Sequence, residues 1–237
     1  MTSRYDYSVM PCNLKVISAN RSHVDAVVQI HLDAFKGFFL ESLGRRFLRE
    51  LYRGFIVEPS GICLVAISID GIVTGFVAGT IQPEGFFRRL LQRRGFAFLW
   101  AGAASFLRHP IRVGRKFVFA IHYRGEKPTN VSSAALLSSI GVAPEAKGKG
   151  IGRALLASFC EETRKAGVLN IFLTTDRDNN ELVNTFYRVN GFQLNSSFLK
   201  ERDRWMNLYS RSCAEIDQDI KEISTNIIYS LGSSSKC

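Results

Sequence analysis

The spacing of apolar and polar residues in the N-terminal part of the chain predicts short strands and amphipathic helices. Apolar runs over 14–17, 62–67 and 72–79 indicate strands, and apolar residues three and four apart over 22–35 and 40–56 indicate helices. Ser22 and Asp25 fit a capping box at the start of the first helix. Asp70 and Gly71 predict a two-residue hairpin turn, because both residue types tolerate a positive φ angle.

The C-terminal part continues this alternation. Strands are predicted over 134–142, 168–174, 192–198 and 204–209, and helices over 150–165 and 180–190. Gly167 and Gly191 are expected to end these two helices, since glycine readily adopts the left-handed conformation of a C-terminal cap. Strands mixed with helices predict a single α/β domain over 1–210. A helical tail is expected over 211–237, where isoleucines at helical spacing would contact the body or a second copy in a homodimer.

The composition is that of an ordinary folded protein. The chain has 237 residues, of which 46% are hydrophobic and 22% charged. Its five cysteines are an odd number without a CxxC pair, so neither a zinc site nor a disulfide framework is expected. We see no signal peptide at the start, and no apolar run approaches the roughly 20 residues of a membrane span. These features predict a cytoplasmic protein with reduced thiols and no metal.

The positive charge is concentrated in one segment. The net charge is +10, and the segment from 82 to 134 holds ten basic and two acidic residues together with nine aromatic rings. We expect an insertion here at about 82–133, with two helices broken near Pro110. It would bind an anionic acceptor, make peripheral membrane contact through rings such as Phe86 and Phe87, or simply cover the sheet. Nucleic-acid binding is not expected, because no RNA- or DNA-binding signature accompanies the charge.

A glycine-rich loop carries the clearest chemical signal. The stretch Val142-Ala-Pro-Glu-Ala-Lys-Gly-Lys-Gly-Ile-Gly-Arg153 joins a predicted strand to a predicted helix. Its glycines let the backbone approach a ligand, and free N–H groups at a helix start favour a pyrophosphate. The Walker pattern is absent, and Arg153 stands where the dinucleotide fingerprint needs its last glycine.

Two motifs together resemble the GNAT superfamily of acyl-CoA-dependent N-acyltransferases. Lys147-Gly-Lys-Gly150-Ile-Gly152 is similar to the family's loop, with Lys147 where the family has Gln or Arg. Asn180-Glu-Leu-Val-Asn-Thr-Phe-Tyr187-Arg-Val-Asn-Gly191-Phe192 is similar to the helix that follows. The resemblance is strong over 134–209, fair over 14–79, and does not cover the insertion or the tail. It implies the GNAT fold, a mixed central sheet with flanking helices, here with a helical insertion.

The resemblance also implies roles for individual residues, with acetyl-CoA as the cosubstrate. The strand residues Ile140, Gly141 and Val142 would pair with the pantetheine arm, and the Val142 N–H would stabilise the oxyanion. Asn180 would bond the same arm, and Tyr187 would protonate the departing thiolate as a general acid. The pyrophosphate would be held by the loop residues Lys147, Gly148, Lys149, Gly150, Ile151, Gly152 and Arg153.

The acceptor and the base are less defined. The attacking amine must lose a proton, and the strand over 134–142 contains no carboxylate. We therefore expect a water-mediated base, with Ser138 or Ser139 holding the water. The rival candidates are Asp176, His122 and Glu41.

A small primary amine is the expected acceptor. The basic insertion favours an anionic one, such as a nucleotide-linked amino sugar of surface-polysaccharide synthesis. Protein and other small-amine acceptors stay open, as does a non-catalytic acyl-CoA-binding protein, although Tyr187 argues for an enzyme.

Overall fold

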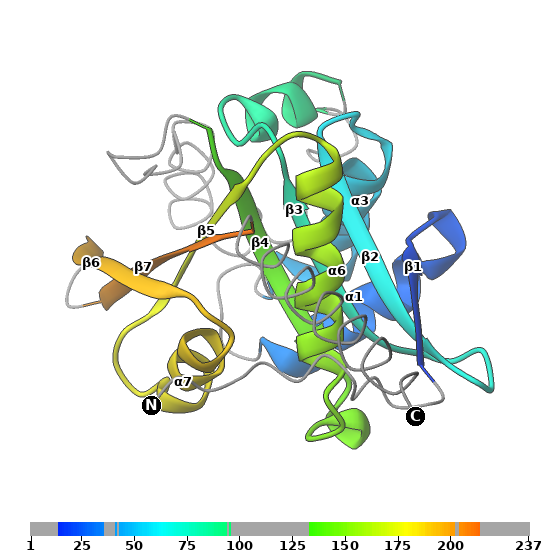
Figure 1. Ribbon diagram of the computed structural model, residues 1–237. Coiled ribbons are helices and arrows are strands. Elements are labelled where there is room, and N and C mark those ends of the chain that lie inside the picture. The colour runs from blue at the N-terminus through cyan, green and yellow to red at the C-terminus, as the bar shows by residue number, and fades with distance from the viewer. Residues whose placement is uncertain are drawn as a thin grey trace, which may run out of the picture.

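The computed structural model describes residues 14–35, 41, 43–93, 95, 133–201 and 204–213. Within these ranges, one seven-stranded sheet has the order β1-β2-β3-β4-β5-β7-β6 (Figure 1). Only β4 and β5 pair in parallel; the other neighbours are antiparallel. The predicted mixed sheet is confirmed. Its strands are β1 Leu14–Ser18, β2 Gly61–Ser68, β3 Val73–Thr80, β4 Ala135–Val142, β5 Asn170–Asp176, β6 Gln193–Glu201 and β7 Arg204–Ser212.

Helices cover both faces of the sheet. Helices α1 (Val24–Ala34) and α3 (Gly44–Val57) lie on one face, and α6 (Ile151–Lys165) lies on the other (Figure 1). An added Cβ at Gly141 would lie 3.4 Å from Ile30 of α1, whereas one at Gly75 would lie 2.9 Å from Leu155 of α6. Helix α7 (Glu181–Val189) follows β5 and contacts β6. The predicted flanking helices therefore cover β3 and β4 from both faces of the sheet.

Two helices end as the sequence predicts. Gly167 and Gly191 have φ angles of 78° and 80°. The residue after each glycine donates its N–H back across the last turn, Val168 to the Thr163 carbonyl at 2.9 Å and Phe192 to the Tyr187 carbonyl at 3.0 Å. These contacts define Schellman caps, which satisfy carbonyl groups that a helix end leaves unpaired.

The predicted capping box of Ser22 and Asp25 is wrong. A short 3-10 turn, η1 (Arg21–His23), precedes α1, and Asn20 caps it by accepting from the Ser22 N–H at 2.9 Å. His23 Nδ1 accepts in turn from the Asn20 N–H at 3.1 Å. Asp25 instead pairs with Arg49 of α3. The asparagine two residues upstream takes the capping position because the chain turns before it becomes α-helical.

The hairpin between β2 and β3 has a longer loop than predicted. Ser68 donates its N–H to the Ile72 carbonyl at 2.9 Å and accepts from the Gly71 N–H at 3.0 Å. Ile69, Asp70 and Gly71 therefore form a three-residue loop, in which Gly71 has a φ angle of 77° and Asp70 keeps a negative one. A left-handed residue after a turn is a usual way to close such a loop.

The first part of the basic segment, residues 86–93, contributes buried side chains to the core. Residues 86–93 are helical, Phe86 is fully buried, and its ring stacks on Phe55 with centroids 4.9 Å apart. Leu90 is also buried, and Arg93 pairs with Glu58 at 2.7 Å. The side chains of Phe86 and Leu90 therefore do not reach the surface, whereas Phe87, the other ring named for membrane contact, is partly exposed. Membrane contact of this segment stays a prediction.

Other sequence expectations lie outside the described residues. These include most of the predicted insertion with its break near Pro110, and the tail beyond Cys213. Strand β7 continues to Ser212, past the expected domain boundary at 210. Among the described helices, none has the length and apolar character to cross a membrane.

A β-bulge interrupts β4 near its middle. Ala78 of β3 faces Ser139 and Gly79 faces Leu137, so Ser138 is an extra residue without a partner on β3. On the other side, β5 pairs only with Ala135 and Leu136. Beyond these two residues β4 and β5 diverge, as expected where a bulge bends a strand.

Gly79, opposite the bulge, should not tolerate a side chain. A Cβ there would lie 2.2 Å from the Leu136 carbonyl oxygen and 2.5 Å from Phe159 Cζ, and the main chain cannot withdraw cheaply. We expect Gly79→Ala to lower the free energy of unfolding by about 2–3 kcal/mol, the cost of overpacking. Urea denaturation would measure it. Gly95→Ala is the control, because a Cβ there meets nothing within 4 Å; equal effects of the two variants would contradict the close approach.

Candidate active site

The diverging part of β4 presents an open backbone edge. Ile140, Gly141 and Val142 pair with β3 on one side and have no β5 partner on the other. Unpaired N–H and C=O groups in a strand form a template for an additional strand. The edge can therefore hydrogen-bond an extended ligand that carries amide groups, as a pantetheine arm does.

The glycine loop leads from this strand into the N-terminus of α6. Gly148 and Gly150 have φ angles of 76° and 75°, and a Cβ at either would meet no described atom within 4 Å. Gly150 is the N-cap and no side chain caps the helix. The first backbone bond runs from the Ala154 N–H to the Gly150 carbonyl at 3.1 Å, which leaves the preceding amides for a ligand. Such an end suits a diphosphate.

The predicted loop residues divide into two groups. Lys147, Lys149 and Arg153 are exposed and can add positive charge around the helix start. Ile151 is buried, and a Cβ at Gly152 would lie 3.3 Å from the Phe186 ring of α7. Ile151 and Gly152 therefore pack α6 against α7. They fix where the loop lies and add no charge to it.

Tyr187 lies on α7 within an aromatic cluster. Its ring centroid is 5.3 Å from that of Phe186, 5.5 Å from Phe192 and 6.0 Å from Tyr209. Burial raises the pKa of the Tyr187 hydroxyl above its ordinary value, so the group stays protonated at neutral pH. The described residues provide no hydrogen-bond partner for this hydroxyl. It is thus available as a proton donor.

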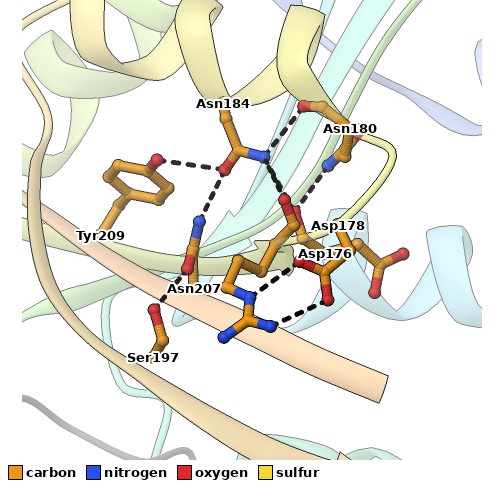
Figure 2. Close-up of polar contacts among 8 residues, drawn as sticks. Asp176, Asp178, Asn180, Asn184, Ser197, Asn207 and Tyr209 are labelled. Carbon is orange, nitrogen blue, oxygen red and sulfur yellow. Dashed lines mark hydrogen bonds and ion pairs between the residues drawn. The ribbon is translucent and has the colours of Figure 1, made fainter. Parts of the chain in front are cut away.

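A buried asparagine fixes α7 to the sheet, and the sequence analysis did not find it. Figure 2 shows Asn184 between Asn180, Asn207 and Tyr209. Its Oδ1 accepts from Asn207 Nδ2 at 2.9 Å and from the Tyr209 hydroxyl at 3.0 Å, while its Nδ2 donates to the Asp176 carbonyl at 3.0 Å. Its position four residues after Asn180 and three before Tyr187 was the available signal, because these spacings share one helix face.

Asn180 and Asp176 belong to the same hydrogen-bond network between α7 and the sheet. Asn180 Nδ2 donates to Thr175 Oγ1 at 2.9 Å and to the Asp176 carbonyl at 3.0 Å, so only its Oδ1 is left for a ligand. Both carboxylate oxygens of Asp176 accept from Arg204, at 2.6 and 3.0 Å. Both oxygens with which Asp176 could take a proton are therefore engaged by Arg204. Of the other candidate bases, Glu41 is partly buried just before α3, and His122 lies outside the described residues.

A second polar chain, also missed from the sequence, ends on β4. His31 Nδ1 lies 2.6 Å from the Tyr52 hydroxyl, which lies 3.2 Å from Ser139 Oγ. All three side chains are buried, whereas the neighbouring Ser138 is exposed at the bulge. His31 and Tyr52 lie on the buried, otherwise largely apolar faces of α1 and α3. The only sign of the path in the sequence is that these two positions carry polar groups. Ser138 or Ser139 was expected to hold a water, which stays a prediction; the Ser139 hydroxyl in addition contacts Tyr52.

The described residues show no other cluster with obvious chemistry. They contain no group of three or more His, Cys, Asp or Glu side chains suited to a metal ion. Cys63, Cys160 and Cys213 are free thiols and are buried.

The fold and the site together define an acyl-CoA-dependent acyltransferase. The distinguishing features are a central sheet that parts between two parallel strands and an uncapped, glycine-rich helix start beside the gap. The model of the family described as "Acetyltransferase (GNAT) family" matches residues 24–192, and the chain belongs to this family. It is therefore an N-acetyltransferase that uses acetyl-CoA, as its two motifs imply.

Solved structures share this fold at low sequence identity. A spermidine N-acetyltransferase variant from Vibrio cholerae is 15% identical with a TM-score of 0.54, over 86% of this chain and 95% of that one. The PaiA N-acetyltransferase from Thermoplasma acidophilum, in complex with coenzyme A, is 16% identical with a TM-score of 0.52, over 84% and 98%. A ribosomal-protein alanine N-acetyltransferase from Escherichia coli is 14% identical with a TM-score of 0.52, over 84% and 94%. No curated protein sequence matches the chain.

His31 should make the stability of the protein depend on pH. Burial lowers its pKa from 6.5 to about 4, so between these values the unfolded chain binds a proton that the native state does not. Stability is therefore lost as the pH falls from 6.5 to 4. The loss due to His31 should reach about 3 kcal/mol, at about 1.4 kcal/mol per pKa unit.

Urea denaturation of the protein and of His31→Phe at several pH values would measure this loss. The wild-type protein should lose more stability than the variant over this range, because both share every other titrating group. Parallel curves would show that burial does not suppress the protonation of His31.

Proposed function

We propose that acetyl-CoA lies along the open edge of β4, with its diphosphate at the N-terminus of α6. The observation that carries this proposal is the divergence of β4 from β5 after Leu136, next to the uncapped helix start at Gly150. The extended pantetheine arm needs the open strand edge, and the charged diphosphate next to it in acetyl-CoA needs the helix start. The chain passes from one to the other within the loop after Val142.

Each candidate residue then has a physical role. Ile140, Gly141 and Val142 supply main-chain hydrogen bonds to the pantetheine arm, and the Val142 N–H stabilises charge on the thioester oxygen. Asn180 can accept from the arm through Oδ1. The diphosphate accepts from the amides at the helix start. Its charge is balanced by the exposed side chains of Lys147, Lys149 and Arg153.

The reaction is direct attack of a primary amine on the thioester carbon. The nitrogen lone pair forms the C–N bond while the electrons of the C–S bond pass to sulfur. Tyr187 donates its proton to the thiolate, and the proton released by nitrogen restores the tyrosine. Burial raises the pKa of Tyr187, so the hydroxyl still carries its proton when the thiolate forms beside it.

We favour an anionic amine as the acceptor, such as a nucleotide-linked amino sugar. The support is the net charge of +10 and its concentration between residues 82 and 134. Two of those arginines are already engaged, Arg89 with the Glu84 carbonyl at 2.9 Å and Arg93 with Glu58. A polyamine cation, the acceptor of a similar structure, would be repelled by the remaining charge. A protein amine is the second candidate, since another similar structure is an N-acetyltransferase of an alanine in a ribosomal protein.

Product analysis by mass spectrometry would test this function. Acetyl-CoA would be incubated with the protein and a panel containing nucleotide-linked amino sugars, spermidine, free amino acids and peptides. We expect an acetylated amino sugar. In Tyr187→Phe its rate should fall about 100-fold or more, the usual worth of a general acid, with acetyl-CoA still bound. An unchanged rate in the variant would exclude Tyr187 as the acid, and acetylated spermidine as the main product would exclude the anionic acceptor.

The positive charge of the loop should contribute to acetyl-CoA affinity. Lys147→Ala with Arg153→Ala should raise the Kd for acetyl-CoA about tenfold at low salt, since each exposed charge near a phosphate adds modestly to binding. The difference should shrink as salt increases. Arg164→Ala with Lys165→Ala, which removes two basic residues at the other end of α6, is the matched control. A comparable loss in that control would mean that only overall charge matters. Isothermal titration calorimetry provides the measurement.

A further inference from the structure

Three buried polar groups form a continuous path from α1 to the open edge of β4. His31 Nδ1, the Tyr52 hydroxyl and Ser139 Oγ are separated by 2.6 and 3.2 Å. Aromatic rings enclose the path: Phe35 lies 4.5 Å from the His31 ring and Phe76 lies 5.1 Å from the Tyr52 ring, centroid to centroid. The path ends on the first residue after the bulge, where β4 has already left β5.

Packing alone does not account for this arrangement. His31 Nε2 is buried and has no hydrogen-bond partner among the described residues. An unsatisfied buried polar atom costs about 1–3 kcal/mol, and an apolar side chain at this position of α1 would avoid that cost. The three groups are therefore better explained by the hydroxyl of Ser139, which they hold at the open edge of β4.

The distances indicate the direction of the hydrogen bonds. A phenol is a stronger donor than an aliphatic hydroxyl, and a neutral imidazole nitrogen is a good acceptor. The short contact between Tyr52 and His31 therefore joins the best donor to the best acceptor, and the ring proton of His31 is on Nε2. The Tyr52 oxygen then accepts from the Ser139 hydroxyl. This leaves the lone pairs of Ser139 Oγ as the free end of the path.

We propose that Ser139 Oγ accepts a hydrogen bond from the amine nitrogen as it attacks the thioester, and that Tyr52 and His31 are positioning residues for this hydroxyl. The inference rests on the proposed placement of acetyl-CoA along β4. Ser139 and Gly141 lie on the same face of the strand, the face that α1 and α3 cover. The hydroxyl thus belongs to the residue three positions before Val142, whose N–H marks the predicted thioester position.

No member of the path has to store a proton. The nitrogen forms the C–N bond, sulfur leaves with the C–S electrons and takes the Tyr187 proton, and the proton lost by nitrogen returns through solvent to Tyr187. Ser139 keeps its own proton throughout. A histidine that stays neutral suits this role, because its Nδ1 must remain an acceptor at every stage; burial keeps the His31 pKa low.

Steady-state kinetics would test the path, using the fastest acceptor of the amine panel. Ser139→Ala and Tyr52→Phe should each lower kcat/KM for the amine about 10- to 100-fold, the effect of one aligned hydrogen bond, and change the KM for acetyl-CoA by less than about twofold. The double variant should be no worse than Ser139→Ala, because the two groups act in series. Thr80→Val is the control: it removes another buried hydroxyl of the sheet, bonded to the Ser60 carbonyl, and should leave the kinetics unchanged.

Two measurements on His31 separate positioning from mere folding. His31→Asn places an amide oxygen near the Nδ1 position and should keep most of the activity, whereas His31→Phe should behave as Tyr52→Phe. Nitrogen NMR of the wild-type protein at pH 7 should show a neutral ring protonated at Nε2. This second measurement needs neither the acceptor nor turnover.

The outcomes distinguish this inference from the proposed function. If the wild-type protein acetylates an amine and Ser139→Ala matches it within about threefold, the path has no role and the function stands. If no panel amine is acetylated, the proposed function fails. The path is then judged by NMR, where a ring protonated at Nδ1 or a charged ring would overturn it.

Discussion

Two parallel strands that separate in the middle of a sheet impose the main constraint on this structure. β4 and β5 pair at two positions and then leave each other's backbone groups without partners. Buried N–H and C=O groups are costly unless something bonds them, so this gap must face water or a ligand. The other elements keep the gap open and of fixed shape. β3 stays paired with β4 on both sides of the bulge, and α6 spans the outer face of β2 to β5.

The two sides of the gap are built differently. On the β4 side, mainly apolar side chains of α1 and α3 pack against the sheet. The hydrogen-bonded path from His31 to Ser139 lies among them. On the β5 side, α7 is held by hydrogen bonds that meet at Asn184, with the Asp176 carboxylate fixed by Arg204. Gly152 connects the sides, because the absence of its side chain lets Phe186 of α7 approach α6. Tyr187 and the open edge of β4 are thus fixed relative to each other by contacts on separate elements.

Local chemistry in the sequence predicted much of the fold, and its failures share a cause. The strands, the helix ends at Gly167 and Gly191, and the exposed glycine loop follow from residue type and spacing within a few positions. The Ser22 capping box failed because Asn20 competes for the same turn. His31 and Tyr52 were missed because their contacts span 21 and 87 residues of chain. Periodicity marks both positions as buried, but only the packed structure shows which polar groups meet there.

The bulge at Ser138 also has a consequence for how the site tolerates change. Its extra residue leaves the register with β3 and the inward and outward faces of β4 consistent on either side. Removing that one residue would let β4 run straight beside β5 with every side chain still on its present face. The bend is therefore set by the number of residues in the strand, whereas Gly141 depends on its identity, because a Cβ there would lie 2.8 Å from the Phe76 ring. A substitution at the exposed Ser138 leaves the residue count and the bulge unchanged, whereas deletion of this one codon is expected to alter the course of β4 beside β5.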